Sequence, residues 1–131
     1  MFPFFPVLLL AAAPRRGSAG VITTDEYRKR SADADDVVLL DVRRPDEYYG
    51  ASGHLTSSIL IPVEQLERRA GELDGYRGRT IVVYCRTGHR SGIAAAMLAE
   101  RGHTALNMLG GIVEWRSKGF PVEHVAPGAP V

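Results

Sequence analysis

The sequence of 131 residues contains a single cysteine, Cys85. One cysteine excludes a disulfide within the chain and a metal site built from several cysteines, and it leaves no second thiol to resolve an oxidised Cys85. An excess of charge of one sign is also missing, because 16 basic and 15 acidic residues leave a formal net charge of +1. We therefore expect no nucleic-acid partner and no anionic membrane surface, and we expect a small partner instead.

Long apolar runs are missing except at the N-terminus, where residues 1–14 carry no charged side chain. This stretch is shorter than the roughly 20 residues that a membrane-spanning helix needs, so we predict no stable transmembrane anchor. Its apolar core at 7–10 and the three alanines that follow are typical of a signal peptide, but no Lys or Arg precedes them and two prolines interrupt them. Two interpretations of residues 1–19 follow: the leader of an exported or periplasmic protein, or a disordered leader of a cytoplasmic one.

The rest of the chain is expected to form one domain. The sequence is 45% hydrophobic and 24% charged, which fits a globular protein of this length. We predict that the domain spans residues 20–124 and that residues 125–131 form a flexible tail, because their prolines, glycine and alanines bury little surface.

Apolar runs of strand length alternate with helical patterns along the domain. After a Gly/Ser-containing linker at 17–20, strands are predicted at 21–22, 37–42, 59–61, 80–84 and 105–109, and helices at 23–30, 45–49, 63–73, 93–101 and 112–118. The first helix has a capping box formed by Thr23 and Glu26, and Ser91 is predicted to be the N-cap of the fourth. This alternation predicts an α/β domain with a mainly parallel sheet, in which functional sites gather at the carboxyl ends of the strands.

Cys85 lies at such a strand end and opens the segment 85–91, which leads into a helix. The N–H groups of a tight loop can point inward at the sulfur, and the following helix presents its positive end to it. Gly88 removes the Cβ atom that would keep the backbone away from an anion. These features favour a reactive thiol with a low pKa over the alternative of a buried, inert cysteine.

Three cationic side chains lie close to Cys85 in the sequence. Arg86 is expected to face an anionic substrate. Arg90 has two interpretations: it also attracts the substrate, or it pairs with a carboxylate such as Asp41 or Glu47. For His89 we favour a mild electrostatic effect from a solvated position over an acid or base role.

The segment 85–91, Cys-Arg-Thr-Gly-His-Arg-Ser, resembles the active-site loop of rhodanese-type sulfurtransferases. Other signatures of that family are similar to three further stretches, which occur in the same order between residues 21 and 122. They are Asp41, Val42, Arg43, Pro45 and Glu47; Gly53, His54, Ile61 and Pro62; and Leu109, Gly110, Gly111, Trp115, Gly119, Phe120, Pro121 and Val122. The resemblance implies a rhodanese-like three-layer domain, with a central five-stranded, mainly parallel sheet flanked by helices.

The resemblance also implies a reaction and a site. Cys85 would take sulfane sulfur from a donor such as thiosulfate, form a persulfide and pass the sulfur to cyanide or a thiol, without a metal or other cofactor. Substrate-binding residues would be Arg86, Thr87, Gly88, His89, Arg90 and Ser91. Asp41 and Arg43 would brace the loop without touching sulfur. The six residues from Cys85 to Arg90 match the sulfurtransferase loop, whereas the related cell-cycle phosphatases use seven.

Two other functions remain open from the sequence. In the first, the protein is a non-enzymatic persulfide carrier or interaction module that serves a partner protein as sulfur acceptor. In the second, Cys85 is a redox sensor, which the lack of a resolving cysteine makes less economical. One stretch departs from the family pattern: Thr56, Ser57 and Ser58 stand where Pro, Gly and Ala are usual, which leaves the shape of that wall of the site open.

Overall fold

The computed structural model describes residues 17–31 and 36–125. In chain order these residues form β1 (Ser18–Ile22), α2 (Thr24–Ser31), β2 (Val37–Asp41), α3 (Pro45–Tyr48), β3 (Ile59–Leu60), α4 (Val63–Arg69), the 3-10 helix η1 (Ala70–Tyr76), β4 (Thr80–Tyr84), α5 (His89–Glu100), β5 (Thr104–Met108) and α6 (Gly111–Ser117). The predicted leader and tail lie almost entirely outside the described residues.

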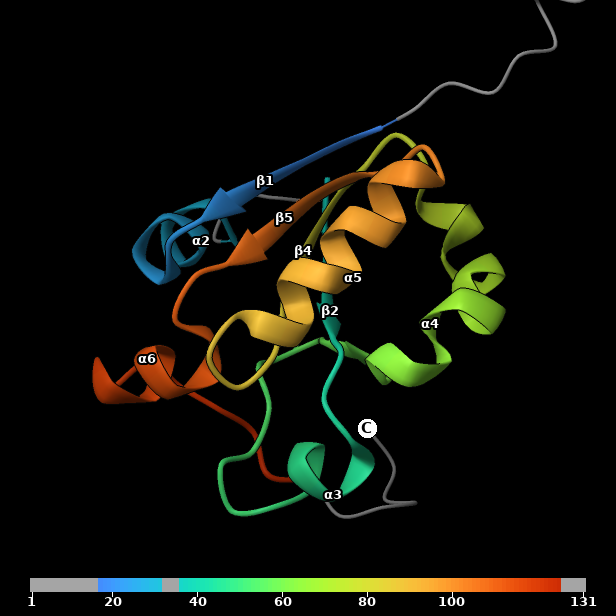
Figure 1. Ribbon diagram of the computed structural model, residues 1–131. Coiled ribbons are helices and arrows are strands. Elements are labelled where there is room, and N and C mark those ends of the chain that lie inside the picture. Colours follow the sequence, from blue (N-terminus) through green and yellow to red (C-terminus); the bar gives the residue numbers. More distant parts are fainter. Residues whose placement is uncertain (1–16, 32–35, 126–131) are drawn as a thin grey trace, which may run out of the picture.

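The strands form one sheet in the order β1-β5-β4-β2-β3 (Figure 1). Every pairing between neighbouring strands is parallel. The predicted five-stranded parallel sheet is therefore confirmed. β4, whose carboxyl end carries Cys85, occupies the centre, so the strand that positions the sulfur is supported by a strand on each side.

Helices cover both faces of the sheet. Successive residues of β4 point to opposite faces: Ile81 and Val83 join the core under α4, η1 and α5, whereas Val82 and Tyr84 join the core under α2 and α6. All four side chains are 0% exposed. A strand that is buried on both faces has a continuous apolar sequence, and this pattern predicted β4.

The first strand is longer than the sequence pattern predicts. β1 begins at Ser18 and pairs with β5 over its whole length, so the predicted linker at 17–20 is wrong for Ser18, Ala19 and Gly20. These side chains are exposed on an edge strand and give no hydrophobic signal, while their backbone pairs with β5. The capping box is confirmed, because the Thr23 N–H donates to Glu26 Oε1 and the Glu26 N–H donates to Thr23 Oγ1.

The rings of His54 and Trp115 are buried and serve the fold. His54 is 4% exposed, stacks on the ring of Tyr48 at 3.8 Å between centroids, and forms an isolated antiparallel bridge with Glu123. Trp115 is 5% exposed in the α2/α6 core, and its indole N–H donates to the carbonyl of Pro121 at 2.8 Å. Both residues therefore hold the C-terminal segment onto the domain.

His103, between α5 and β5, is buried without a polar partner. It is 2% exposed, and neither ring nitrogen has a hydrogen-bond partner among the described residues. Burial, with a smaller effect from the charge of Arg77, lowers the pKa of His103 below its ordinary value of 6.5. The folded protein thus disfavours the protonated ring.

We predict that His103 weakens the fold in acid. Its lowered pKa means that the unfolded chain binds the proton more readily, so the free energy of unfolding falls as the pH drops below about 6.5. Urea unfolding at about pH 8 and about pH 5 measures this loss, and His103→Leu should reduce it. His89→Gln, a change at an exposed histidine, is the control and should leave the loss unchanged. An equal loss in wild type and His103→Leu would contradict the prediction.

Candidate active site

The loop that carries Cys85 is a tight connection between β4 and α5. Gly88 has φ 119°, a conformation that favours glycine, and α5 begins immediately after it at His89. The N–H of Gly88 points back at the sulfur, with 3.1 Å between the nitrogen and Cys85 Sγ. The predicted N-cap role of Ser91 is wrong, since Ser91 lies within the first turn of the helix.

The start of α6 packs directly on this loop. The N–H of Ile112 donates to the carbonyl of Cys85 at 3.0 Å, and the N–H of Val113 donates to the carbonyl of Arg86 at 3.1 Å. A Cβ atom on Gly111 would come within 2.4 Å of the Arg86 carbonyl oxygen, so this close approach requires glycine. Gly111, the first residue of α6, therefore allows the helix to pack directly against the loop backbone.

The sulfur of Cys85 lies among hydrogen-bond donors although the residue is only 1% exposed. Burial raises the pKa of the thiol, but hydrogen bonds lower it more, and the net shift is downward. The donors are the hydroxyl of Ser91 and the backbone N–H groups of Ser91, Gly88 and Thr87. The thiol thus occupies a polar cradle and not a hydrocarbon core, and its lowered pKa agrees with the sequence-based expectation.

Ser91 and Asn107 form a hydrogen-bonded network behind the sulfur. Ser91 is 0% exposed, and its Oγ lies 3.3 Å from Cys85 Sγ and 2.6 Å from Asn107 Oδ1. The amide nitrogen of Asn107 donates to the carbonyl of Gly88 at 3.1 Å. Asn107 is not predicted from the sequence, although a single amide within the strand β5 is a usable signal.

Arg90 is held by a carboxylate, which is the second of its two predicted interpretations. Its guanidinium binds Glu47 through two hydrogen bonds of 2.7 and 2.9 Å. The hydrogen bond from Arg90 is the main cause that lowers the pKa of Glu47 to about 2, while the charge of Cys85 is among the smaller causes that raise the pKa of Arg90. The pair ties the first turn of α5 to α3, and Arg90 still acts on the sulfur through space.

Arg86, Thr87 and His89 are exposed on the rim of the loop. Their side chains form no hydrogen bond or ion pair with the part of the chain that the structure describes. Arg86 borders a cavity of about 540 Å³ between the loop, α6 and the segment after β2, which Arg43, Arg116 and the carboxylate of Glu47 also line. Cys85 itself does not line this cavity. The rim of the loop is therefore cationic and open to an incoming anion.

Asp41 and Arg43 form a buried ion pair at the end of β2. Arg43 Nη2 lies 2.7 Å from Asp41 Oδ2. The side chain of Arg43 is 1% exposed and that of Asp41 is 0% exposed. Arg43 also donates to the hydroxyl of Ser52 at 3.1 Å and to the carbonyl of Gly53 at 2.7 Å. The pair fixes the segment that follows α3.

This geometry changes the predicted role of Asp41 and Arg43. They are expected from the sequence to brace the cysteine loop, but outside their own pair the hydrogen bonds of the Arg43 side chain go to the neighbouring segment. Their link to the loop is indirect: the guanidinium of Arg43 lies over the ring of Tyr84, 5.6 Å from its centroid, and Tyr84 directly precedes Cys85.

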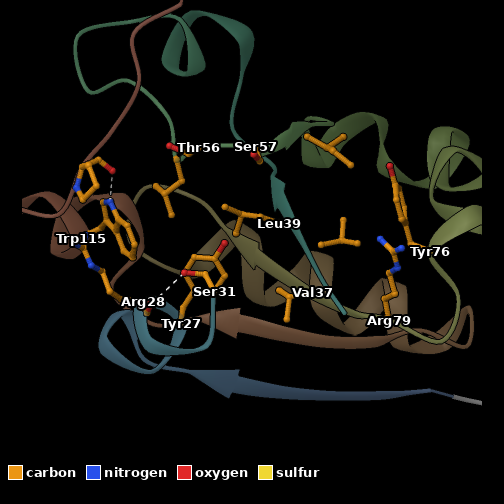
Figure 2. A pocket seen from close by; sticks show the side chains of 14 residues that line it. Tyr27, Arg28, Ser31, Val37, Leu39, Thr56, Ser57, Tyr76, Arg79 and Trp115 are labelled. Carbon is orange, nitrogen blue, oxygen red and sulfur yellow. Dashed lines mark hydrogen bonds between the residues drawn. The ribbon is translucent and has the colours of Figure 1, made fainter. Parts of the chain in front are cut away.

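A second cavity lies away from the cysteine. It measures about 650 Å³ and is bordered by Leu39 of β2, Trp115 of α6, and Thr56 and Ser57 from the connection before β3 (Figure 2). The stretch that departs from the family pattern thus shapes this cavity. Cys85 does not border it.

The described residues contain no group of three or more His, Cys, Asp or Glu side chains placed to hold a metal ion. Among them there is also no helix of the length and apolarity needed to cross a membrane.

Together, the fold and the loop define a parallel α/β protein with a low-pKa cysteine at the end of its central strand. A family model described as "Rhodanese-like domain" matches residues 23–118. The chain belongs to this family. The resemblance drawn from the loop and its companion signatures is thereby confirmed.

Several relatives carry names that concern sulfur transfer. A protein of Allochromatium vinosum named "Sulfurtransferase" is 36% identical over 107 residues, which cover 81% of this chain and 94% of that protein. Thiosulfate sulfurtransferase PspE of Escherichia coli is 33% identical over 73 residues, covering 56% of this chain and 68% of that protein.

The chain spans about half of another relative, the HTH-type transcriptional regulator Rv0324 of Mycobacterium tuberculosis, with 35% identity over 120 residues and 51% of its length covered.

Solved structures share the fold. The crystal structure of a rhodanese-related protein from Thermoplasma volcanium matches with a TM-score of 0.73 and 28% identity, covering 81% of this chain and 99% of that one. The arrangement of sheet and helices is therefore that of the family.

We predict that Arg43→Leu destabilises the protein severely. The variant leaves the buried carboxylate of Asp41 without its partner, which should lower the free energy of unfolding by about 3–5 kcal/mol. Urea unfolding followed by circular dichroism measures the loss. The control is Arg44→Leu, which removes the neighbouring arginine and its surface pair with Asp46. We expect a far smaller change there, and equal losses in the two variants would refute the structural role of Arg43.

Proposed function

We propose that the protein is a sulfurtransferase that moves sulfane sulfur from thiosulfate or a similar donor to cyanide or a thiol through a persulfide on Cys85. The observation that supports this most is the cradle of hydrogen-bond donors around a thiol of lowered pKa. A thiolate is the nucleophile in sulfur chemistry, and the cradle stabilises that form before any substrate arrives.

The reaction balances without a cofactor. The Cys85 thiolate attacks the outer sulfur of thiosulfate, the sulfur–sulfur bond of the donor breaks, and sulfite leaves with the electron pair. In the second half, cyanide attacks the outer sulfur of the persulfide, thiocyanate leaves, and the thiolate is restored. Because the nucleophile is already ionised, no residue has to take a proton from it, which fits the exposed position of His89.

Donor binding is assigned to the rim of the loop. Cys85 is 1% exposed, so the donor has to present its sulfur past the loop residues. Arg86 is exposed on that rim, and its side chain has no hydrogen-bond or ion-pair partner among the described residues. An arginine in this position can bind the oxygens of an anionic donor with charge-assisted hydrogen bonds. The backbone N–H groups of Thr87, Gly88 and Ser91 would then face the transferred sulfur.

A second candidate is a sulfur carrier that discharges to a partner protein. A relative from Bacillus subtilis, 33% identical over 95 residues, is named "Putative sulfur carrier protein YrkF". Fast uptake of sulfur combined with negligible release to cyanide and small thiols would favour the carrier.

We predict that Cys85→Ala abolishes sulfur transfer and leaves the fold intact. Incubation of the wild type with thiosulfate should add one sulfur, about 32 Da, which mass spectrometry locates at Cys85, and cyanide should remove it as thiocyanate. Circular dichroism of the variant checks the fold. A wild type that accepts no sulfur from any sulfane donor, although its thiol is free, would contradict the proposed function.

We predict that Arg86→Ala weakens the use of an anionic donor. Loss of a charge-assisted hydrogen bond should raise the KM for thiosulfate about tenfold or more, with a smaller effect on kcat. Steady-state formation of thiocyanate measures both constants. Arg68→Ala, which removes an exposed cation on α4, is the matched control. If both variants have the same KM as the wild type, Arg86 does not bind the donor.

A further inference from the structure

The hydroxyl of Ser91 has one proton to donate and lies near two hydrogen-bond acceptors. Its oxygen is 2.6 Å from Asn107 Oδ1 and 3.3 Å from Cys85 Sγ. A carbonyl oxygen and a thiolate both accept hydrogen bonds, and a serine hydroxyl can donate only one. When Cys85 is ionised, Asn107 and the sulfur therefore compete for the same proton.

The structure fixes which end of the Asn107 amide faces Ser91. The other end of the amide lies 3.1 Å from the carbonyl oxygen of Gly88, which can only accept. If the amide were flipped, two oxygens would face each other there without a proton between them. The Gly88 carbonyl also accepts from the N–H of Gly92 at 3.1 Å, which holds it in place at the start of α5. Asn107 thus has to present its oxygen to Ser91.

We propose that Asn107 is a positioning residue that competes with Cys85 for the hydroxyl proton of Ser91 and thereby limits how readily the thiol ionises. In the protonated protein the thiol donates to Ser91 Oγ and Ser91 donates to Asn107. On ionisation the thiol proton leaves to solvent, and the Ser91 hydroxyl turns from Asn107 to the sulfur. No bond to the Ser91 proton breaks in this step.

The consequence for sulfur transfer rests on the proposed function. In a persulfide anion the charge lies mainly on the outer sulfur, so the inner sulfur is a weaker hydrogen-bond acceptor than a thiolate. The hydroxyl of Ser91 then donates to Asn107 again. The amide of Asn107 would thus stabilise the persulfide form of the protein relative to the free thiolate. The hydrogen bond of the Ser91 hydroxyl would change its acceptor during the reaction cycle.

Other charged groups act on the sulfur independently of Asn107. Arg90 of α5 is paired with Glu47 of α3, and Arg86 and His89 are exposed on the loop rim. Asn107 carries no charge and is neither on this loop nor in these pairs. A double-mutant cycle with Ser91 therefore separates its effect from theirs.

The test is a titration of Cys85 in four proteins: wild type, Asn107→Ala, Ser91→Ala and the double variant. The ultraviolet absorbance of the thiolate reports on Cys85 alone, because the chain has one cysteine, and Cys85→Ala supplies the blank. Asn107→Ala should lower the thiol pKa by about 0.5–1 unit, since Ser91 is freed to donate to the sulfur. Ser91→Ala should raise the pKa, and adding Asn107→Ala to it should change nothing further.

A merely structural role for Asn107 gives a different result. If the amide only orders the loop, Asn107→Ala would raise the thiol pKa, and it would do so with or without Ser91; either finding overturns the proposal. Thr104→Ala, an exposed change at the far end of β5, is the control and should leave the pKa unchanged.

Failure of this inference can be told from failure of the proposed function. The titration needs no sulfur donor, so it reads the competition for the proton even if no sulfur is ever transferred. Mass spectrometry of the wild type after thiosulfate treatment reads sulfur uptake even if Asn107 has no effect on the thiol pKa.

Discussion

The site depends on an opposition between two effects at one atom: burial of Cys85 disfavours its anion, and converging hydrogen-bond donors favour it. The backbone donors among them are fixed before the charge appears, which favours the anion. Gly88 turns its N–H toward the sulfur, and α5 starts at the next residue, so the loop N–H groups and the positive end of the helix share a direction. Preorganised dipoles of this kind need no rearrangement when the thiol ionises.

The surrounding structure keeps the loop in this shape from several sides. β4 is packed on both faces, α6 donates to the loop carbonyls from outside, and the pair of Arg90 with Glu47 joins α5 to α3. Arg43 and Asp41 act one step further away, on the segment beside the site. The family's scattered signatures thus correspond to parts of one support for a single sulfur atom.

Much of this could be predicted from the sequence, because the buried strands and the loop have local patterns. The run before Cys85 predicted β4, and the tight loop expected at Gly88 is present. What could not be predicted has two causes. β1 pairs through its backbone while its side chains face solvent, so residues 18–20 resembled a linker. The partner of Arg90 lies 43 positions away, so the sequence left Asp41 and Glu47 equally available.

The rate of sulfur uptake from thiosulfate as a function of pH tests the central claim most directly. If the cradle favours the Cys85 thiolate, the rate of persulfide formation should reach half of its plateau at a pH below the ordinary cysteine pKa of about 8.5. A rate that is half-maximal at about pH 8.5 or above would show an ordinary thiol and contradict the account.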